Sequence, residues 1–174
     1  RTGMGAVMGS KNLKAVVVSD GTAKPLIADP ERFRQVSSEL RTKIRKSPFY
    51  PLFSTYGMAG PLAIENESGI LSVRNLQQAG GFEEVEQVTC ETLARDFYTG
   101  AKSCFSCSVG CMKEWEVKEG PYAGLKGTKI PEGCNAPNGP HCGNSYAPSL
   151  FKIYHLCNEY GIDVLDFGCL MASV

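Results

Sequence analysis

Three cysteines stand close together in the middle of the chain, at Cys104, Cys107 and Cys111. Their C-x2-C-x3-C spacing would bring the thiols to one side of a partly helical turn, where they could converge on a metal centre. Three close cysteines and one distant cysteine are typical of a cubane [4Fe–4S] cluster. A structural zinc site would usually add a second C-x2-C or a histidine pair, and neither follows here. Iron–sulfur ligation is therefore favoured, with zinc and unligated thiols as the alternatives.

The chain contains eight cysteines, which are Cys90, Cys104, Cys107, Cys111, Cys134, Cys142, Cys157 and Cys169. An even number would indicate disulfides in a secreted protein. However, 174 residues with 43% hydrophobic side chains can build a core without such cross-links. We therefore expect free thiols and a reducing, cytoplasmic location. The cysteines outside the array are interpreted as buried thiols.

The overall charge excludes some classes of partner. Lysine and arginine together number 18, as do aspartate and glutamate, so the formal net charge is zero. This balance does not suggest nucleic acid or an anionic membrane surface as a partner. No apolar run approaches the ~20 residues of a membrane span, and the first residues do not resemble a signal peptide. Because the sequence begins at Arg1 and ends at Val174 inside a predicted helix, we expect it to be a fragment.

A short β segment followed by helices is predicted to position these residues. The glycine-rich residues 1–9 indicate a turn, and the β-branched residues 13–19 predict a strand. Asp29 and Pro30 predict an N-cap and a first helical position, so an amphipathic helix should run from there to Pro48. Further helices are expected over residues 52–56, 61–67, 91–98 and 148–160, and from 164 onward. Thr89 is expected to cap the helix of residues 91–98, and Gly161 is expected to end that of residues 148–160 in the left-handed conformation.

Glycines and prolines break the segment of residues 119–149, which predicts a long ordered loop. Such loops in compact domains are often functional. The predicted fold class is therefore mainly α, with a short β segment in front of a helical domain. A boundary is expected near residues 20–28, so that residues 1–24 end one domain and residues 25–174 form another.

The first residues, Arg1-x-Gly3-x-Gly5, have the form of an anion-cradling loop. The pattern is weak by itself, and without other support a simple turn before a strand is the favoured interpretation. It does not match the dinucleotide-binding fingerprint, because a predicted strand follows the glycines where a helix should begin.

Four segments in order along the chain together resemble the aldehyde:ferredoxin oxidoreductase family. They are the glycine-rich stretch of residues 1–15, the Leu-Ser-Val-Arg-Asn-Leu-Gln stretch of residues 71–77 with the Gly-Phe-Glu of residues 81–83, the cysteine array, and the Asn-Glu-Tyr-Gly-Ile-Asp of residues 158–163. The last segment is similar to the family's D-x-x-G-L-D pterin motif, with Asn158 in place of aspartate and Ile162 in place of leucine. The aspartate-to-asparagine change would turn a charge-assisted hydrogen bond into a neutral one.

This resemblance implies a helical domain of the family type, which follows the end of a pterin-binding β domain. It implies a tungsten bis-pterin cofactor, with molybdenum as an alternative metal, a Mg²⁺ ion bridging the pterin phosphates, and a [4Fe–4S] cluster ligated by the three cysteines. The fourth cluster ligand would lie beyond Val174. The residues implied to hold the pterins are Arg1, Gly3, Gly5, Ala6, Asn158, Ile162 and Asp163.

The segment of residues 124–143 looks like that of one particular branch of the family. It keeps Pro131-Glu132 and Cys142-Gly143, but it lacks a Tyr-Glu-Thr sequence and has His141 before the Cys-Gly pair. In this respect it looks like the catalytic tungsten subunit of class II benzoyl-coenzyme A reductase. The implied reaction is the two-electron dearomatisation of benzoyl-CoA, with Glu132 and His141 as proton donors. Without the resemblance, both residues would be interpreted as ordinary loop side chains.

Two further functions stay open on the sequence. One is an aldehyde ferredoxin oxidoreductase with the same cofactors, and the other is a zinc or iron–sulfur binding module without catalytic activity. The implied partners are an acyl-CoA substrate and an electron-transferring iron–sulfur subunit or ferredoxin, with the chain as part of a hetero-oligomer. Nucleic acid and a membrane span are not expected.

Overall fold

The structure is a computed structural model that describes residues 2–19, 21, 25–130 and 132–174, with the side chains of 132 and 133 outside the description. The helices are α1 (Met4–Ser10), α2 (Pro30–Arg45), α3 (Tyr50–Tyr56), α4 (Leu62–Glu67), α5 (Cys90–Asp96), α6 (Glu132–Asn138), α7 (Ala147–Tyr160) and α8 (Val164–Ala172). The 3-10 turns are η1 (Val85–Gln87), η2 (Gly120–Tyr122) and η3 (Pro140–Cys142), and the strands are β1 (Ser72–Val73), β2 (Gln78–Ala79), β3 (Tyr98–Lys102), β4 (Met112–Glu116) and β5 (Lys126–Thr128). The fold is therefore mainly α, as predicted.

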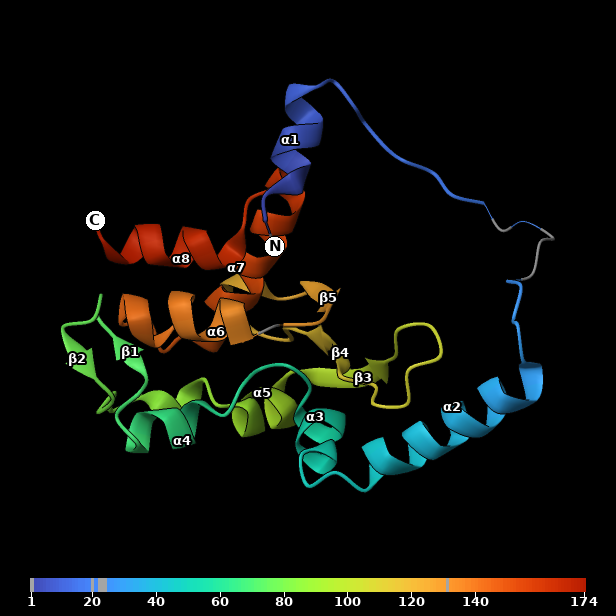
Figure 1. The fold of residues 1–174 in the computed structure, drawn as a ribbon. Coiled ribbons are helices and arrows are strands. Elements are labelled where there is room, and N and C mark those ends of the chain that lie inside the picture. Colours follow the sequence, from blue (N-terminus) through green and yellow to red (C-terminus); the bar gives the residue numbers. More distant parts are fainter. Residues whose placement is uncertain (1, 20, 22–24, 131) are drawn as a thin grey trace.

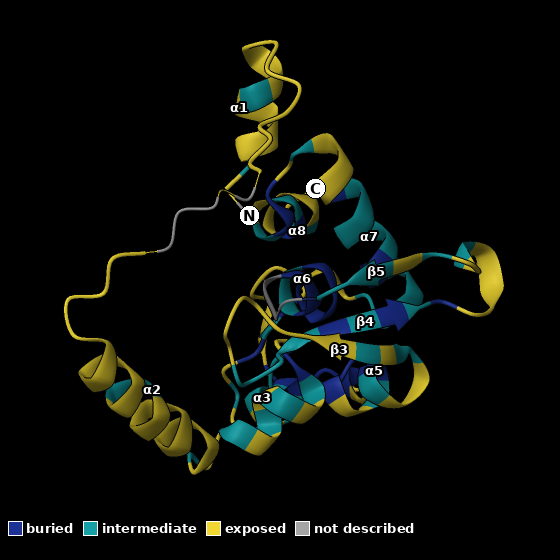
Figure 2. Cartoon of the chain, turned by 90° about the vertical axis from the view of Figure 1, so that its right-hand side faces the viewer, coloured by how far each residue is buried: buried dark blue, intermediate teal, exposed yellow. Residues whose placement is uncertain are grey.

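Two helices stand apart from the main body of the molecule. Helices α3–α8 and the small sheets pack together, whereas α1 projects from the top in Figure 1 and α2 lies to one side. Figure 2 shows that α2 is almost entirely exposed, as are residues 11–19 and 25–29. Helix α2 contains no buried residue, although Phe33 and Leu40 remain on its surface at 56% and 52% exposure. Its predicted packing on one side is therefore absent from the described residues.

Local capping signals predicted several helix ends correctly. The Asp29 carboxylate accepts a hydrogen bond from the Arg32 N–H at 2.9 Å, and Pro30 occupies the first turn of α2. The Thr89 hydroxyl caps α5 in the same way. Gly161 ends α7 in the left-handed conformation, with φ of 69°. These ends follow from local chemistry, so the sequence alone indicates them.

The hydrophobic core lies between α5, α7 and the three-stranded sheet. The Phe151 ring from α7 lies 4.5 Å from the Trp115 ring of β4 and 4.9 Å from the Phe97 ring, measured between ring centroids. Leu62, Leu93 and Leu150 are fully buried around this group. The order of this sheet is β3-β4-β5, with both pairs antiparallel.

Two asparagines of α6 form buried side-chain hydrogen bonds. Asn135 is fully buried, and its amide donates to the carbonyl of Ala59 at 3.3 Å and to that of Val88 at 3.1 Å. Asn138 donates to the carbonyls of Cys134 and Val164, both at 3.0 Å. Helix α6 is therefore joined by side-chain hydrogen bonds to segments from both halves of the chain.

The predictions for the first twenty residues are wrong. Residues 4–10 form helix α1 instead of a turn, and residues 13–19 form no strand. A strand requires a hydrogen-bonded neighbour, and no described segment pairs with this one. Val17 and Val18 are accordingly 87% and 88% exposed.

The long loop predicted for residues 119–149 is also wrong. This segment contains η2, β5, α6, η3 and the start of α7. Pro137 lies inside α6 and argues against a helix in isolation. Tertiary packing overrides that preference, because Gly168 of α8 lies so close that an added Cβ would be 2.7 Å from the Pro137 side chain.

No helix in the described part of the chain combines the length and apolar character needed to cross a membrane.

Candidate cofactor and catalytic site

The structure brings together the two glycine-containing segments from opposite ends of the chain. The Ala6 N–H donates to the carbonyl of Gly161 at 3.3 Å, and the Thr2 N–H donates to the Asp163 carboxylate. The backbones touch, because a Cβ added at Gly161 would lie 2.5 Å from the Ala6 nitrogen and 2.5 Å from the Gly5 carbonyl carbon. Only glycine at position 161 allows this approach. We call this junction of residues 2–6 with residues 157–163 the glycine junction.

A shallow cleft of about 150 Å³ opens at the glycine junction. Its lining consists of Gly3, Met4, Gly5, Cys157, Asn158, Gly161 and Ile162. Asn158 is exposed on the last turn of α7 and donates its amide N–H to the Tyr154 carbonyl at 2.7 Å. Four predicted pterin-binding residues thus line one cleft, whereas Arg1 lies outside the described residues.

Asp163 lies next to this cleft and is the N-cap of α8. Its carboxylate accepts hydrogen bonds from the backbone N–H groups of Thr2, Leu165 and Asp166, the Leu165 bond being 2.8 Å long. These donors, with Thr2 first, hold the pKa of the Asp163 carboxyl below its ordinary value, because they favour the charged form. The carboxylate therefore stays ionised near neutral pH and joins α1 to α8.

The cysteine array lies on the connection between β3 and β4, a segment we call the cysteine loop (residues 103–111). The predicted helical turn is wrong, because this segment contains only turns and bends. Cys104 and Cys107 are exposed, Cys111 is half-buried, and the Cys107 N–H donates to the Cys104 carbonyl at 3.0 Å. Within the described residues, the three thiols do not gather into a group that could hold a metal ion.

The base of the cysteine loop is nevertheless anchored and positively charged. The Tyr50 hydroxyl donates to the Ser108 carbonyl at 3.2 Å, and the Lys113 ammonium donates to the Ser54 carbonyl at 2.5 Å. Lys113 is only 6% exposed, and desolvation lowers its pKa, while the neighbouring Cys111 acts in the opposite direction. The buried Ser108 hydroxyl has no hydrogen-bond partner among the described residues. A negatively charged centre on this loop would therefore meet a buried cation and a free hydroxyl.

His141 is the buried titratable side chain of the predicted catalytic pair. It lies in η3 at 8% exposure, and its Nδ1 is 2.5 Å from the Ser72 hydroxyl of β1. η3 packs against α8, where the Cys142 thiol donates to the Gly168 carbonyl at 3.3 Å. His141 is thus placed against the helix that Asp163 caps.

Glu132 and His141 start from opposite ends of one short helix. Glu132 begins α6, and His141 follows its last residue by three positions. The seven residues of this helix span about 10 Å. The Glu132 side chain lies outside the description, so its predicted role stays a prediction.

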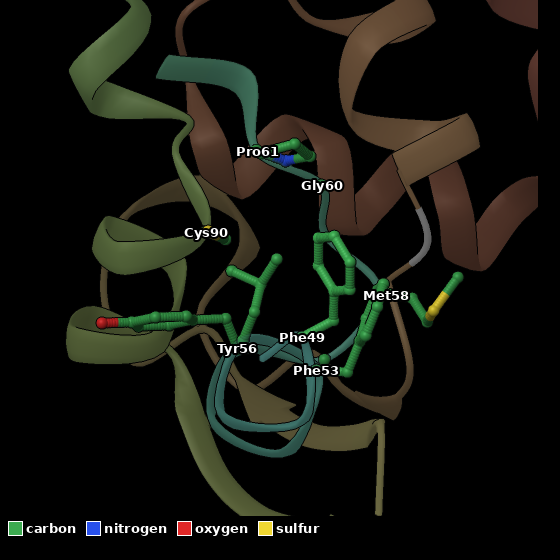
Figure 3. A pocket seen from close by; sticks show the side chains of 9 residues that line it. Phe49, Phe53, Tyr56, Met58, Gly60, Pro61 and Cys90 are labelled. Carbon is green, nitrogen blue, oxygen red and sulfur yellow. The ribbon is translucent and has the colours of Figure 1, made fainter. Parts of the chain in front are cut away.

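An apolar cavity of about 180 Å³ lies between α3 and α5. Figure 3 shows the side chains of Phe49, Phe53 and Tyr56 around it, with Cys90 at its inner wall. Burial and the neighbouring Glu91 raise the pKa of the Cys90 thiol to about 12, so it is neutral and unreactive. This cavity is a hydrophobic feature without catalytic groups of its own.

The residues present fit the implied cofactors to different degrees. The glycine junction offers a cleft with backbone and amide groups, which suits the polar edge of a bound heterocycle. The cysteine loop offers the thiols that an iron–sulfur cluster requires, beside a buried lysine, but the thiols are apart. The cleft is therefore formed by the chain itself, while the cluster ligands fit in chemistry alone.

Sequence reasoning missed two features of these sites. The burial of Lys113 was not predicted, although the alternation of Lys113, Trp115 and Val117 is a period-2 signal of a half-buried strand. Ser72 was quoted only as part of a motif, and no local pattern indicates its contact with His141, 69 positions away.

Known proteins resemble this chain over most of its length. A family described as "Aldehyde ferredoxin oxidoreductase, domains 2 & 3" matches residues 35–174. The tungsten-containing aldehyde ferredoxin oxidoreductase of Pyrococcus horikoshii is 35% identical over 99% of this chain, and that of Thermococcus kodakarensis is 33% identical over 99%. An aliphatic sulfonate oxidoreductase, WOR-like subunit, of Pyrococcus furiosus is 26% identical over 97% of the chain. The chain spans only 28% of the length of the first two relatives and 27% of the third.

Proposed function

Because the chain belongs to the aldehyde ferredoxin oxidoreductase family, we propose that it is part of a tungsten enzyme that oxidises an aldehyde to a carboxylate. Water supplies the added oxygen, and two electrons leave for a ferredoxin-type acceptor. The observation that supports this proposal most strongly is 35% identity to a tungsten-containing aldehyde ferredoxin oxidoreductase across 99% of the chain. These relatives favour aldehyde oxidation over the benzoyl-CoA reduction that the sequence first suggested.

In this proposal the glycine junction holds the pterins. Arg1 and the backbone of Gly3, Gly5 and Ala6 would face the phosphate region, where a Mg²⁺ ion would bridge the two pterins. Asn158, Ile162 and Asp163 would face a pterin edge through side-chain and backbone oxygens. The tungsten bis-pterin, or its molybdenum counterpart, would supply the two-electron redox chemistry. This chain would contribute shape and hydrogen bonds.

The cysteine loop would hold the [4Fe–4S] cluster through Cys104, Cys107 and Cys111, with a fourth ligand from elsewhere in the protein. Lys113 would offset part of the negative charge of the cluster, because its ammonium is buried beside Cys111. The loop is exposed, so the thiols can move together when iron is bound.

Glu132 and His141 would move the protons of the reaction. His141 is buried and has a fixed partner on Nδ1, which leaves Nε2 as the nitrogen for exchange with a substrate. Glu132 begins α6 and would act from the other end of that helix. Proton transfer by such groups typically contributes 10²–10⁴-fold to a rate.

Benzoyl-CoA reduction is the second candidate. It rests on the residues of α6 and η3, where Glu132 is retained, a Tyr-Glu-Thr sequence is absent, and His141 precedes Cys142-Gly143. Its substrate would be an acyl-CoA, and its electrons would flow in the opposite direction, from an iron–sulfur subunit or ferredoxin to the aromatic ring.

The proposal also covers the domain organisation, the assembly and the location of the enzyme. Residues 1–24 would end a pterin-binding domain, and residues 25–174 would form a helical domain. The similarity to a WOR-like subunit supports membership of a hetero-oligomer. The eight cysteines are free, which is consistent with a reducing cytoplasm.

The test is turnover by the full-length protein, purified without oxygen. An aldehyde with an oxidised viologen dye, and benzoyl-CoA with a reduced low-potential dye, are assayed separately. Aldehyde oxidation without benzoyl-CoA reduction supports the proposal, and the reverse result supports the second candidate. Activity with neither substrate, in a preparation that contains tungsten and iron, contradicts both.

A further inference from the structure

The motif of residues 71–77 is so far without a role, and it packs directly on η3. We propose that Ser72 is a positioning residue that orients the imidazole of His141, and that the turn of residues 74–76 fixes the backbone of Pro140 and His141. This inference rests on the proposed role of His141 in proton transfer. It adds a second element, distant in sequence, to that site.

The hydrogen bond between Ser72 and His141 determines which ring nitrogen is free. The Ser72 hydroxyl lies 2.5 Å from Nδ1, and the ring is 8% exposed, so water has little access to compete for that nitrogen. The Ser72 oxygen can accept a hydrogen bond from Nδ1–H in the neutral ring that carries its proton on Nδ1, and also in the doubly protonated ring. With the Nδ1 proton held in this way, the contact survives proton gain and loss, and Nε2 is the nitrogen that exchanges the proton.

Two backbone hydrogen bonds hold the same element to η3. The Arg74 N–H donates to the Pro140 carbonyl at 3.0 Å, and the Asn75 N–H donates to the His141 carbonyl at 2.8 Å. The Arg74 side chain lies against Gly143, with its Cγ 3.4 Å from a Cβ added there. The histidine is thus held through its ring and through its own carbonyl group.

The backbone of this turn is strained. Arg74, Asn75 and Leu76 have φ angles of 46°, 54° and 63°, a left-handed run without a glycine. Such runs persist only where surrounding contacts determine them, and they occur often at functional sites. Here the bonds to Pro140 and His141 supply those contacts. The strain is therefore localised at the element that positions His141.

The experiment compares Ser72→Ala, Ser72→Thr and the matched control Ser68→Ala in the full-length, metal-loaded protein. Ser68 is exposed at the end of α4, and its hydroxyl bonds only to carbonyls of its own helix, Ile64 and Glu65. The first readout is the rate of modification of His141 by diethyl pyrocarbonate, followed by mass spectrometry of its peptide. The second is kcat and KM with the substrate found in the turnover assay.

Ser72→Ala should raise the modification rate of His141 by roughly three- to tenfold, the factor that corresponds to the loss of one hydrogen bond. It should lower kcat by at least a similar factor with KM little changed, since the ring loses its orientation but the substrate contacts remain. Ser72→Thr should restore both values, because it keeps a hydroxyl on a residue suited to a strand. Ser68→Ala should match the wild type.

Equal modification rates in the wild type and Ser72→Ala would overturn the inference. So would an unchanged kcat in Ser72→Ala despite faster modification. A metal-loaded wild type without turnover would instead contradict the proposed function, while the modification rates would still decide whether Ser72 holds the ring.

Discussion

The glycine junction and the cysteine loop are both predicted to bind cofactors, yet the chain prepares them differently. At the glycine junction, backbone groups from residues 2–6 and 157–163 meet in direct hydrogen bonds, and the cleft is formed without a ligand. In the cysteine loop, the thiols of Cys104 and Cys107 are exposed and apart. Backbone contacts need only the fold, whereas thiolates repel one another until a metal neutralises them. The comparison predicts that stability depends on the first region and metal content on the second.

The largest expected effect is complete loss of iron in Cys107→Ser. One missing thiolate leaves an incomplete ligand set, so the visible absorbance of the cluster should disappear together with the iron. The metal-free protein should unfold at the same urea concentration as metal-free wild type, because the Cys107 side chain is exposed. The control is Cys169→Ser, because this cysteine lies outside the array and is exposed; the prediction of buried thiols is wrong for Cys142 and Cys169. Retention of full iron content by Cys107→Ser would remove this residue from the ligand set.

The next largest effect is expected for Asn135→Asp, which tests the buried hydrogen bonds of α6. The new carboxylate would face the carbonyl oxygens of Ala59 and Val88 in a fully buried position. An uncompensated buried charge should lower the free energy of unfolding by about 3–5 kcal/mol. Urea denaturation measures this loss, and Asn158→Asp on the exposed side of α7 serves as the control. Equal losses in the two variants would show that α6 is not the rigid support described above.

The substitution Gly161→Ala should disrupt the backbone contacts of the glycine junction. Alanine would have to adopt a φ of 69° and place its Cβ 2.5 Å from the Ala6 nitrogen, so α1 should detach from α7. The left-handed conformation alone costs about 1–2 kcal/mol, and the pterin content should fall as well. Gly9→Ala is the control, since nothing lies within 4 Å of its added Cβ. Unchanged stability and cofactor content in Gly161→Ala would mean that the junction has no role in binding.

The smallest effect concerns the acid stability that Asp163 provides. Its carboxyl pKa is lower in the folded state, so its contribution is complete above the unfolded value of about 3.9 and is lost as the pH falls through the folded pKa. Asp163→Asn removes this titration, while asparagine still caps α8. Urea denaturation at pH 6 and at pH 3 should therefore show a smaller acid-induced loss in the variant. An identical loss of stability in both proteins would show that the carboxyl pKa of Asp163 is the same in the folded and unfolded states.

The sequence predicted best what depends on local chemistry. Asp29, Thr89 and Gly161 end or begin helices through their own side chains or backbone freedom, and all three act as expected. The family resemblance likewise identified the two segments that meet at the glycine junction. Their contact could not be read from either segment alone, because it joins residues about 160 positions apart.

The failures occur where tertiary contacts override local patterns. Pro137 disfavours a helix, yet the close approach of Gly168 and the buried bonds of Asn135 stabilise α6 around it. The valines at 16–18 favour a strand, yet the described residues provide no neighbouring strand. The cysteine spacing predicts the ligands of an iron–sulfur site, but spacing does not determine whether the thiols converge before the metal is bound.

The most direct test of the central claim is elemental analysis of the full-length protein, purified without oxygen. Tungsten, or molybdenum in its place, together with about four iron atoms per chain, is the expected result, because we propose that the glycine junction holds the pterins and the cysteine loop holds the cluster. A protein with zinc in the cysteine loop, or with none of these metals, would contradict the account.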